Sequence, residues 1–235
     1  MPNSVSSHPT IRTVASFLAG HAIMLFARLV TAVRGDWRGV EPVPKQRVYF
    51  VNHVSHADFV LIWTTLPGRL RYQTRPVAGA DYWLKTKLKR FIGEDVFNSV
   101  LIERKPSDAV KSPTTESTAP ASSPIAIMSD ALNQGQSLII FPEGTRNTTD
   151  KKLLPLKSGL YHLAKANPNV ELVPVWINNL HRVLPKGEFI PIPLACTVTY
   201  GDALVLQENE SKDTFISRAE EALLNTSTAT EVAPA

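Results

Sequence analysis

Short apolar runs alternate with longer stretches of helical periodicity along the chain. Six runs are typical of β-strands: QRVYFVN, RPVAG, NSVLIE, QSLIIF, ELVPVWI and ACTVTYG. Between them, the spacing of apolar residues predicts helices over about 57–66, 81–91, 125–134 and 156–166. Strands that alternate with helices indicate an α/β fold, a single domain with a largely parallel central sheet flanked by helices.

The N-terminal stretch VASFLAGHAIMLFARLVTAV, residues 14–33, is almost long enough to cross a bilayer. His21 and Arg28 lie on one face of such a helix, about 20° from each other. Because a charge at the bilayer centre is costly, the pattern favours an amphipathic helix lying in the membrane surface. An ordinary amphipathic core helix is the alternative. A secretory signal is disfavoured because the two residues interrupt the apolar run.

The length of 235 residues suits one domain. We expect residues 1–40 to form the membrane-associating helical segment and residues 41–224 to form the folded domain. The stretch KSPTTESTAPASSP, residues 111–124, is rich in Ser, Thr and Pro and predicts a flexible insertion. Residues 225–235 predict a disordered tail, and GDWRGVEPVP predicts a loop because of its Gly and Pro content.

Composition and charge narrow the class of protein. A hydrophobic content of 43% with 20% charged residues is typical of a globular chain. The single cysteine, Cys196, cannot form an intramolecular disulfide, which fits a reducing compartment. Residues 69–90 carry seven Lys or Arg side chains against Asp81 alone, a local balance of +6 that attracts polyanions unless it is only a solvated face. Few aromatic residues interleave with these cations, which disfavours nucleic-acid binding.

The first polar cluster follows a predicted strand, in FVNHVSHADFVLIW, residues 50–63. On one continuous helix His53 and Asp58 would be about 140° apart, so they meet only if His53 precedes the helix. The SHAD stretch matches a capping box with Ser55 as N-cap, so we expect the helix to begin near His56, which would face solvent. Asp58 then either only caps the helix or accepts from one imidazole nitrogen of His53, leaving the other free to take a proton.

The second polar cluster ends another apolar run, in SLIIFPEGTRN, residues 137–147. Pro142 stops the strand, and Gly144 permits a positive φ. Glu143 and Arg146 then stand at the carboxyl end of a strand, where open α/β sheets bind their ligands. The alternative is a tight turn with a surface ion pair, which contributes little.

Three single residues complete the pattern. Arg104 ends the stretch SVLIERK, and its planar guanidinium suits phosphate oxygens. Lys157 precedes a predicted helix, and Pro174 interrupts the apolar run ELVPVWI.

Together, NHVSHAD, LIERK, FPEGTRN and LVPVWI resemble the four sequence blocks of the glycerolipid acyltransferases typified by lysophosphatidate acyltransferase. The similarity runs from about Val48 to Ile177. The first and third blocks match closely. The second lacks a glycine usually found near its start, where Asn98 and Ser99 stand, and the fourth matches only through Pro174 and its apolar flanks.

The resemblance implies transfer of a fatty acyl group from acyl-CoA or acyl-ACP to the free hydroxyl of lysophosphatidate, giving phosphatidate. It implies His53 as the general base and Asp58 as the group that orients it. It also implies a set of residues around the acceptor's phosphate: Arg104, Glu143, Gly144, Thr145, Arg146 and, on weaker grounds, Lys157. Backbone amides near His53 are candidate oxyanion donors. No acyl-enzyme is expected, because the chain lacks a Gly-x-Ser-x-Gly elbow.

We expect no cofactor beyond the acyl thioester co-substrate and no metal, because the six histidines are scattered without ligand spacing. The implied partners are a lysophospholipid, the acyl thioester, the membrane surface and acyl carrier protein as one of the two carriers. The implied location is the cytoplasmic face of a membrane, with peripheral or monotopic attachment. Two alternatives stay open: the same chemistry on another lysophospholipid or lipid acceptor, and a membrane-surface lipid-binding protein that has lost catalysis.

Overall fold

The chain folds around one seven-stranded sheet. The structure is a computed structural model that describes residues 11–55, 57–103, 123–183 and 194–231. Its strands are β1 (Arg34–Trp37), β2 (Arg47–Val51), β3 (Thr74–Gly79), β4 (Val100–Ile102), β5 (Ser137–Ile140), β6 (Glu171–Asn178) and β7 (Thr197–Tyr200). They lie in the order β1-β7-β6-β2-β5-β3-β4, and every neighbouring pair is parallel except β6 and β7. The predicted α/β fold with a largely parallel sheet is confirmed.

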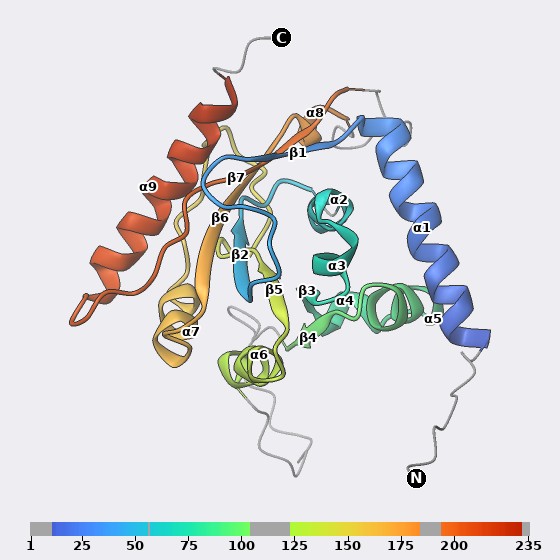
Figure 1. The fold of residues 1–235 in the computed structure, drawn as a ribbon, viewed down its shortest axis with the longest axis horizontal. Helices are drawn as coiled ribbons and strands as arrows, with labels where there is room; N and C mark the ends of the chain where they lie inside the picture. The colour runs from blue at the N-terminus through green and yellow to red at the C-terminus, as the bar shows by residue number, and fades with distance from the viewer. Residues whose placement is uncertain (1–10, 56, 104–122, 184–193, 232–235) are drawn as a thin grey trace.

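Helices cover both faces of this sheet. They are α1 (Ile11–Thr31), α2 (Asp58–Thr65), α3 (Gly68–Arg71), α4 (Ala80–Trp83), α5 (Lys87–Arg90), the π-helix η1 (Phe91–Val96), α6 (Pro124–Asn133), α7 (Gly159–Ala166), α8 (Leu180–Val183) and α9 (Lys212–Glu231). In Figure 1, α6, α7 and α9 lie on one side of the sheet, and α1, α2 and α3 lie on the other. The candidate site described below lies at the carboxyl ends of the central strands, between these two layers of helices.

The central strand β2 shows how two cores form. Val48 and Phe50 pack into the cluster that includes residues of α6, α7 and α9, and Tyr49 and Val51 pack into the cluster that includes residues of α2. Every residue of β2 is buried. A parallel strand that is covered on both faces needs apolar residues on both, which is why the run from Val48 to Val51 is continuous rather than alternating.

Three of the four predicted helices begin and end within three residues of the expected positions. The prediction of one helix over 81–91 is wrong, because the segment divides into α4, α5 and the start of η1. Thr86 interrupts it in an extended conformation, and its hydroxyl accepts from the backbone N–H of Lys89 at 3.2 Å. A threonine hydroxyl that caps a new helix start competes with continuation of the previous helix.

The prediction that GDWRGVEPVP is a loop is wrong at its start, because Gly35–Trp37 belong to β1. This edge strand pairs with β7 in parallel, and Trp37 stacks on Tyr200 with ring centroids 3.7 Å apart. Partners more than 160 residues away in the chain therefore stabilise a segment that has little strand pattern of its own.

The prediction of a disordered tail over 225–235 is wrong for residues 225–231, which continue α9. Thr226 and Ser227 are buried, and the Thr226 hydroxyl donates to the carbonyl of Ala222 at 2.7 Å. Packing against the sheet thus stabilises a helix end that is poor in apolar residues. Residues 232–235 and residues 111–122 of the expected insertion lie outside the described residues, whereas Ser123 caps α6.

The helix α1 places its apolar side chains outward. Over residues 12–31 it is long and apolar enough to cross a membrane, and only 11% of that window is buried. Small residues face the protein: a Cβ added at Gly20 would lie 3.4 Å from Trp63, and Ala27 is buried. The exposed side chains are Val14, Phe17, Leu18, Leu25, Phe26 and Leu29. This arrangement is the reverse of an ordinary amphipathic core helix.

Candidate active site

His53 lies just beyond the carboxyl end of β2, and three hydrogen bonds and one ring contact hold it. Its Nδ1 atom lies 2.7 Å from Oδ2 of Asp58. Its backbone N–H donates to Oε1 of Glu143 at 2.6 Å, and its carbonyl accepts from the N–H of Asn147 at 2.7 Å. The imidazole also stacks on Phe141, with ring centroids 4.3 Å apart. Ring and backbone are therefore both held in one position.

Asp58 is the first residue of α2 and has no exposed surface. Besides the imidazole, its Oδ2 atom accepts from the backbone N–H groups of Val54 at 2.8 Å and Ser55 at 2.9 Å. Burial raises the pKa of this carboxyl, and the hydrogen bond to His53 opposes the rise. The carboxylate thus caps the turn and contacts the imidazole, so the two predicted roles are structurally compatible.

The predicted helix start is wrong by two residues. The hydroxyl of Ser55 accepts from the N–H of Ala57 at 3.2 Å and does not cap the helix, which begins at Asp58. Only the returning half of a capping box is present, because the Asp58 carboxylate accepts from the Ser55 N–H. Because the backbone of the turn donates to the Asp58 carboxylate, the helix begins at Asp58, two residues later than predicted. His56 lies outside the described residues.

Glu143 differs from its expected position beside the acceptor's phosphate. Its side chain is buried, with a relative exposure of 2%, and its Oε2 atom accepts from the N–H of Leu154 at 2.9 Å. Since Oε1 accepts from the His53 N–H, the carboxylate links the turn after β5 to the loop after β2. Burial raises the pKa of Glu143, and the two N–H donors oppose the rise. The contacts of Glu143 thus hold the backbone of His53 in place, a role that we call a clamp.

Asn52 is a second positioning residue, which we did not predict as part of the site. Its Oδ1 atom accepts from the backbone N–H of Ile177 at 2.8 Å, and its Nδ2 donates to the carbonyl of the same residue at 3.3 Å. These bonds fix the end of β2 to β6 next to His53. The available signal was a polar residue at the end of a buried apolar strand.

Two cavities meet at His53. The first, of about 170 Å³, includes Gly144 and Lys157 in its wall, and the second, of about 440 Å³, includes Thr145 and Arg146. These four residues are exposed, and Gly144 has the predicted positive φ, at +73°. Four of the predicted binding residues thus lie around the two cavities. Arg104 lies outside the described residues.

The second cavity is largely apolar away from His53. It runs beside β3 towards α1, α4 and η1, which contribute Ile23, Trp83 and Ile92 to its wall. Phe59 of α2 and Phe97 also line it. The wall is therefore mostly aliphatic and aromatic, with Asp81 and Arg146 as its charged residues.

The candidate oxyanion donors near His53 are occupied. The backbone N–H of His53 donates to Glu143, and those of Val54 and Ser55 donate to Asp58. These three amides therefore cannot also stabilise an oxyanion, which corrects our expectation. Among the described residues, no group of three or more His, Cys, Asp or Glu side chains is arranged to hold a metal ion.

A model of the family described as Acyltransferase matches residues 36–178, which contain the end of β1, the strands β2 to β6 and both polar clusters. The chain belongs to the acyltransferase family.

Relatives of this acyltransferase-family chain carry a common name. The 1-acyl-sn-glycerol-3-phosphate acyltransferase of Limnanthes alba is 28% identical over 198 residues, 82% of this chain and 62% of that protein. The alpha form from Homo sapiens is 27% identical over 185 residues, 75% of this chain and 57% of that protein. The chain thus matches less than two thirds of their length. The crystal structure of the 1-acyl-sn-glycerophosphate (LPA) acyltransferase PlsC from Thermotoga maritima shares the fold, with a TM-score of 0.64 at 18% identity over 95% of this chain and 85% of that chain.

The second sequence block of this acyltransferase-family chain lacks a glycine, and the structure shows how the chain accommodates the change. Asn98 has a φ of +48°, a left-handed conformation that asparagine adopts more readily than most residues. Its carbonyl accepts from Nε of Arg75 at 2.6 Å. Asn98 therefore adopts a backbone conformation that glycine also favours.

The basic segment 69–90 is partly structural. Arg71 is buried and donates to the carbonyls of Trp63 at 2.8 Å and Leu66 at 2.7 Å. Arg69 donates to the carbonyl of Pro42 at 3.1 Å. These arginines hold loops in place, whereas Lys85 and Lys87 are exposed. The exposed lysines around α5, rather than the whole segment, are therefore the residues expected to attract polyanions.

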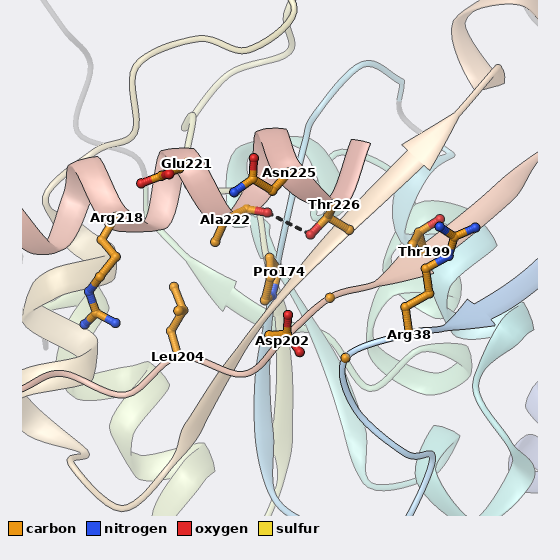
Figure 2. Close-up of a pocket in the computed structure, with 12 residues that line it drawn as sticks. Arg38, Pro174, Thr199, Asp202, Leu204, Arg218, Glu221, Ala222, Asn225 and Thr226 are labelled. Atoms are coloured by element: carbon orange, nitrogen blue, oxygen red, sulfur yellow. Dashed lines mark hydrogen bonds between the residues drawn. The ribbon is translucent and has the colours of Figure 1, made fainter. Parts of the chain in front are cut away.

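A further cavity, of about 330 Å³, lies between α9 and the segment that follows β7 (Figure 2). Its wall includes Arg38, Pro174, Asp202, Arg218 and Thr226, and none of the predicted site residues. The guanidinium of Arg218 is paired with Glu210 at 2.7 Å. This cavity is separate from the candidate active site.

Proposed function

We propose that the protein transfers a fatty acyl group from an acyl thioester to the free hydroxyl of lysophosphatidate, which yields phosphatidate. One observation carries the proposal: the imidazole of His53, held by Asp58 at 2.7 Å, borders both cavities. The names of the relatives in Limnanthes alba and Homo sapiens support the choice of acceptor. The acyl carrier in this proposal is coenzyme A or acyl carrier protein.

His53 acts as the general base in the proposed reaction. Because Asp58 accepts at Nδ1, that nitrogen carries the proton and Nε2 is free to take another. Nε2 removes the proton of the acceptor hydroxyl as its oxygen attacks the thioester carbonyl. The new C–O bond forms, the C–S bond breaks, and the imidazolium returns the proton to the departing thiolate. Asp58 stabilises the imidazolium in between.

Positioning of the two substrates contributes the remainder of the rate acceleration in the proposed reaction. General-base catalysis supplies roughly 10²–10⁴-fold, so the two substrates must also be held in a reactive orientation. Arg146 and Lys157 are exposed cations at the mouths of the cavities, on the side where the acceptor's phosphate would lie. Arg104 is a further cation in the proposal. Glu143 acts indirectly, through the backbone of His53.

The apolar interior of the second cavity holds an acyl chain in this proposal, and α1 joins it to a membrane. Ile23 of α1 belongs to the cavity wall, and the opposite face of α1 exposes large apolar side chains. On α5, Leu88 is 68% exposed and stands next to the exposed Lys87, which suits an anionic bilayer surface. We therefore propose peripheral or monotopic attachment at a cytoplasmic membrane face.

The test is the His53→Ala protein, assayed with a radiolabelled acyl thioester and lysophosphatidate in mixed micelles. We expect kcat to fall by roughly 10²–10⁴-fold. His162→Ala is the matched control, because this histidine is exposed on α7 and should leave kcat unchanged. A His53→Ala protein that transferred acyl groups as fast as the parent would refute the base assignment.

A panel of acceptors completes the test. Lysophosphatidate should be acylated faster than lysophospholipids with larger head groups or an aminolipid, since the cavity mouths present cations to a phosphate. Faster acylation of another lipid would show that this lipid is the acceptor and would leave the proposed reaction chemistry unchanged. Vesicle binding without any acyl transfer by the parent protein would indicate a lipid-binding protein instead.

A further inference from the structure

The segment of residues 80–90 comprises α4, α5 and the turn between them, and none of its residues is buried. Its inner side nevertheless forms part of the second cavity, whose wall includes Asp81, Tyr82 and Trp83. A segment with so little buried surface opens at a much lower cost in free energy than the core does. Residues 80–90 are therefore a movable part of the cavity wall.

Trp83 is the contact that seats this segment on the rest of the protein. Its ring makes a T-shaped contact with that of Phe59, with centroids 5.8 Å apart, and Phe59 makes another with Phe97 at 4.9 Å. All three aromatic residues line the second cavity. Gly93 leaves room for the seated ring, since a Cβ added there would lie 3.1 Å from Trp83.

The outer side of residues 80–90 combines apolar and cationic side chains. Leu84 is 41% exposed and Leu88 is 68% exposed, and the exposed Lys85 and Lys87 lie between them in the chain. The π-helix η1, which directly follows the segment, packs on α1, so the segment lies near the helix with the apolar outer face (Figure 1). Leucines among lysines near such a helix suit an anionic bilayer.

We propose that residues 80–90 form a lid over the second cavity and that an anionic bilayer holds this lid open. In water, opening exposes Trp83 and the apolar cavity wall, which favours the closed lid. At a bilayer, Leu84, Leu88 and the lysines bring the lid to the surface, and Trp83 enters lipid instead of water. The bilayer therefore binds the open form more tightly, as a population shift requires. The inference rests on the proposed function in that the second cavity receives an acyl chain.

The experiment measures acyl transfer from octanoyl-CoA to octanoyl-lysophosphatidate, which dissolve without a bilayer, by the full chain. Vesicles of dioleoylphosphatidylglycerol should raise kcat/KM by roughly tenfold or more, because an open form populated at about 10% or less lowers the rate in proportion. Vesicles of uncharged dioleoylphosphatidylcholine should stimulate less, since they do not attract the lysines. No stimulation by either kind of vesicle would overturn the inference.

Substitution of the two exposed leucines tests the outer side of the lid. Leu84→Ser with Leu88→Ser should lose most of the stimulation, at a lipid concentration at which sedimentation shows that the variant is still bound. Leu224→Ser is the matched control, because this exposed leucine lies on α9. Equal stimulation of the double variant and the parent would overturn the inference.

Substitution of Gly93 tests the seat of Trp83. Gly93→Ala should raise the rate without vesicles towards the stimulated rate, because the added Cβ displaces the ring from its closed position. Gly68→Ala is the control, since a Cβ there meets nothing within 4 Å. A Gly93→Ala protein that depends on vesicles as strongly as the parent would contradict the lid.

Acyl carrier protein is the alternative partner of the lysines. Lys85→Glu with Lys87→Glu should lower the stimulation by anionic vesicles with either thioester as donor. A loss of rate confined to reactions with acyl carrier protein would assign the surface to that protein and overturn the role of the bilayer.

Fluorescence quenching by vesicles with brominated acyl chains separates this inference from the proposed function, because it requires no turnover. The quenching that Trp83→Phe removes measures entry of Trp83 into lipid, whereas Trp176→Phe should remove none, since Trp176 is buried in the core. Quenching of Trp83 without any acyl transfer refutes the proposed function alone. Acyl transfer while Trp83 stays unquenched refutes the lid alone.

Discussion

Replacement of Glu143 by glutamine separates a substrate contact from a structural clamp. The two carboxylate oxygens accept from the backbone N–H groups of His53 at 2.6 Å and Leu154 at 2.9 Å, inside the protein. Glutamine keeps the volume but turns one acceptor into an NH₂ group that faces an N–H donor. Glu143→Gln therefore breaks one of the two links while it leaves both cavity walls intact.

The expected loss follows from the kind of bond that is broken. A hydrogen bond to a charged group contributes about 1.5–3 kcal/mol, so the free energy of unfolding should fall by that amount. In a domain of this size, 1 kcal/mol lowers Tm by roughly 2–4 °C, which gives a decrease of roughly 3–12 °C. Because the bond also holds His53, kcat should fall while KM for lysophosphatidate changes little.

Thermal unfolding by circular dichroism and steady-state acyl-transfer kinetics measure both effects. Glu208→Gln serves as the control, because Glu208 is exposed and the same substitution there should leave Tm and kcat unchanged. An unchanged Tm together with a raised KM for lysophosphatidate alone would refute the clamp. That result would return Glu143 to the substrate contact suggested by its motif.

Three further predictions address the neighbouring chemistry. Asp58→Asn should lower kcat by roughly 10²-fold or more, because the amide no longer stabilises an imidazolium, and an unchanged kcat would contradict the orienting role. The double substitution Phe17→Ser and Leu29→Ser should weaken vesicle partitioning, measured by sedimentation, by roughly tenfold for each side chain. The control Val205→Ser, which lies away from α1, should leave partitioning unchanged. An equal loss of partitioning in the control and the double variant would contradict docking through α1. The folded-state pKa of Glu143 is raised above the ordinary 4.5, so the folded state holds the proton longer and stability decreases as pH rises from 4.5 through the raised pKa. The Tm difference between the parent and Glu143→Gln should therefore be larger near pH 4.5 than at pH 7, and the opposite trend would contradict the raised pKa.

Local patterns predicted much of the fold because the underlying physics is local. The central strands needed apolar residues on both faces, so the middle parts of β2, β5 and β6 were visible as continuous apolar runs. The contact of His53 with Asp58 spans only five residues, so turn geometry alone indicated how the two side chains could meet. The positive φ of Gly144 was likewise visible in the residue type.

Other features depended on residues that are far apart in the chain. The bond between His53 and Glu143 spans 90 residues, and the bonds of Asn52 to Ile177 span 125, so no local pattern distinguished a clamp from a ligand contact. The same holds for β1, which needs β7, and for the last turns of α9, which need the sheet.

The order and type of the main elements were therefore encoded in the alternation of apolar and polar residues, since each element must present an apolar face to bury. The use of each polar side chain was decided only when distant segments came together. Burial and pairing depend on neighbours in space, which is why a motif glutamate became a backbone clamp.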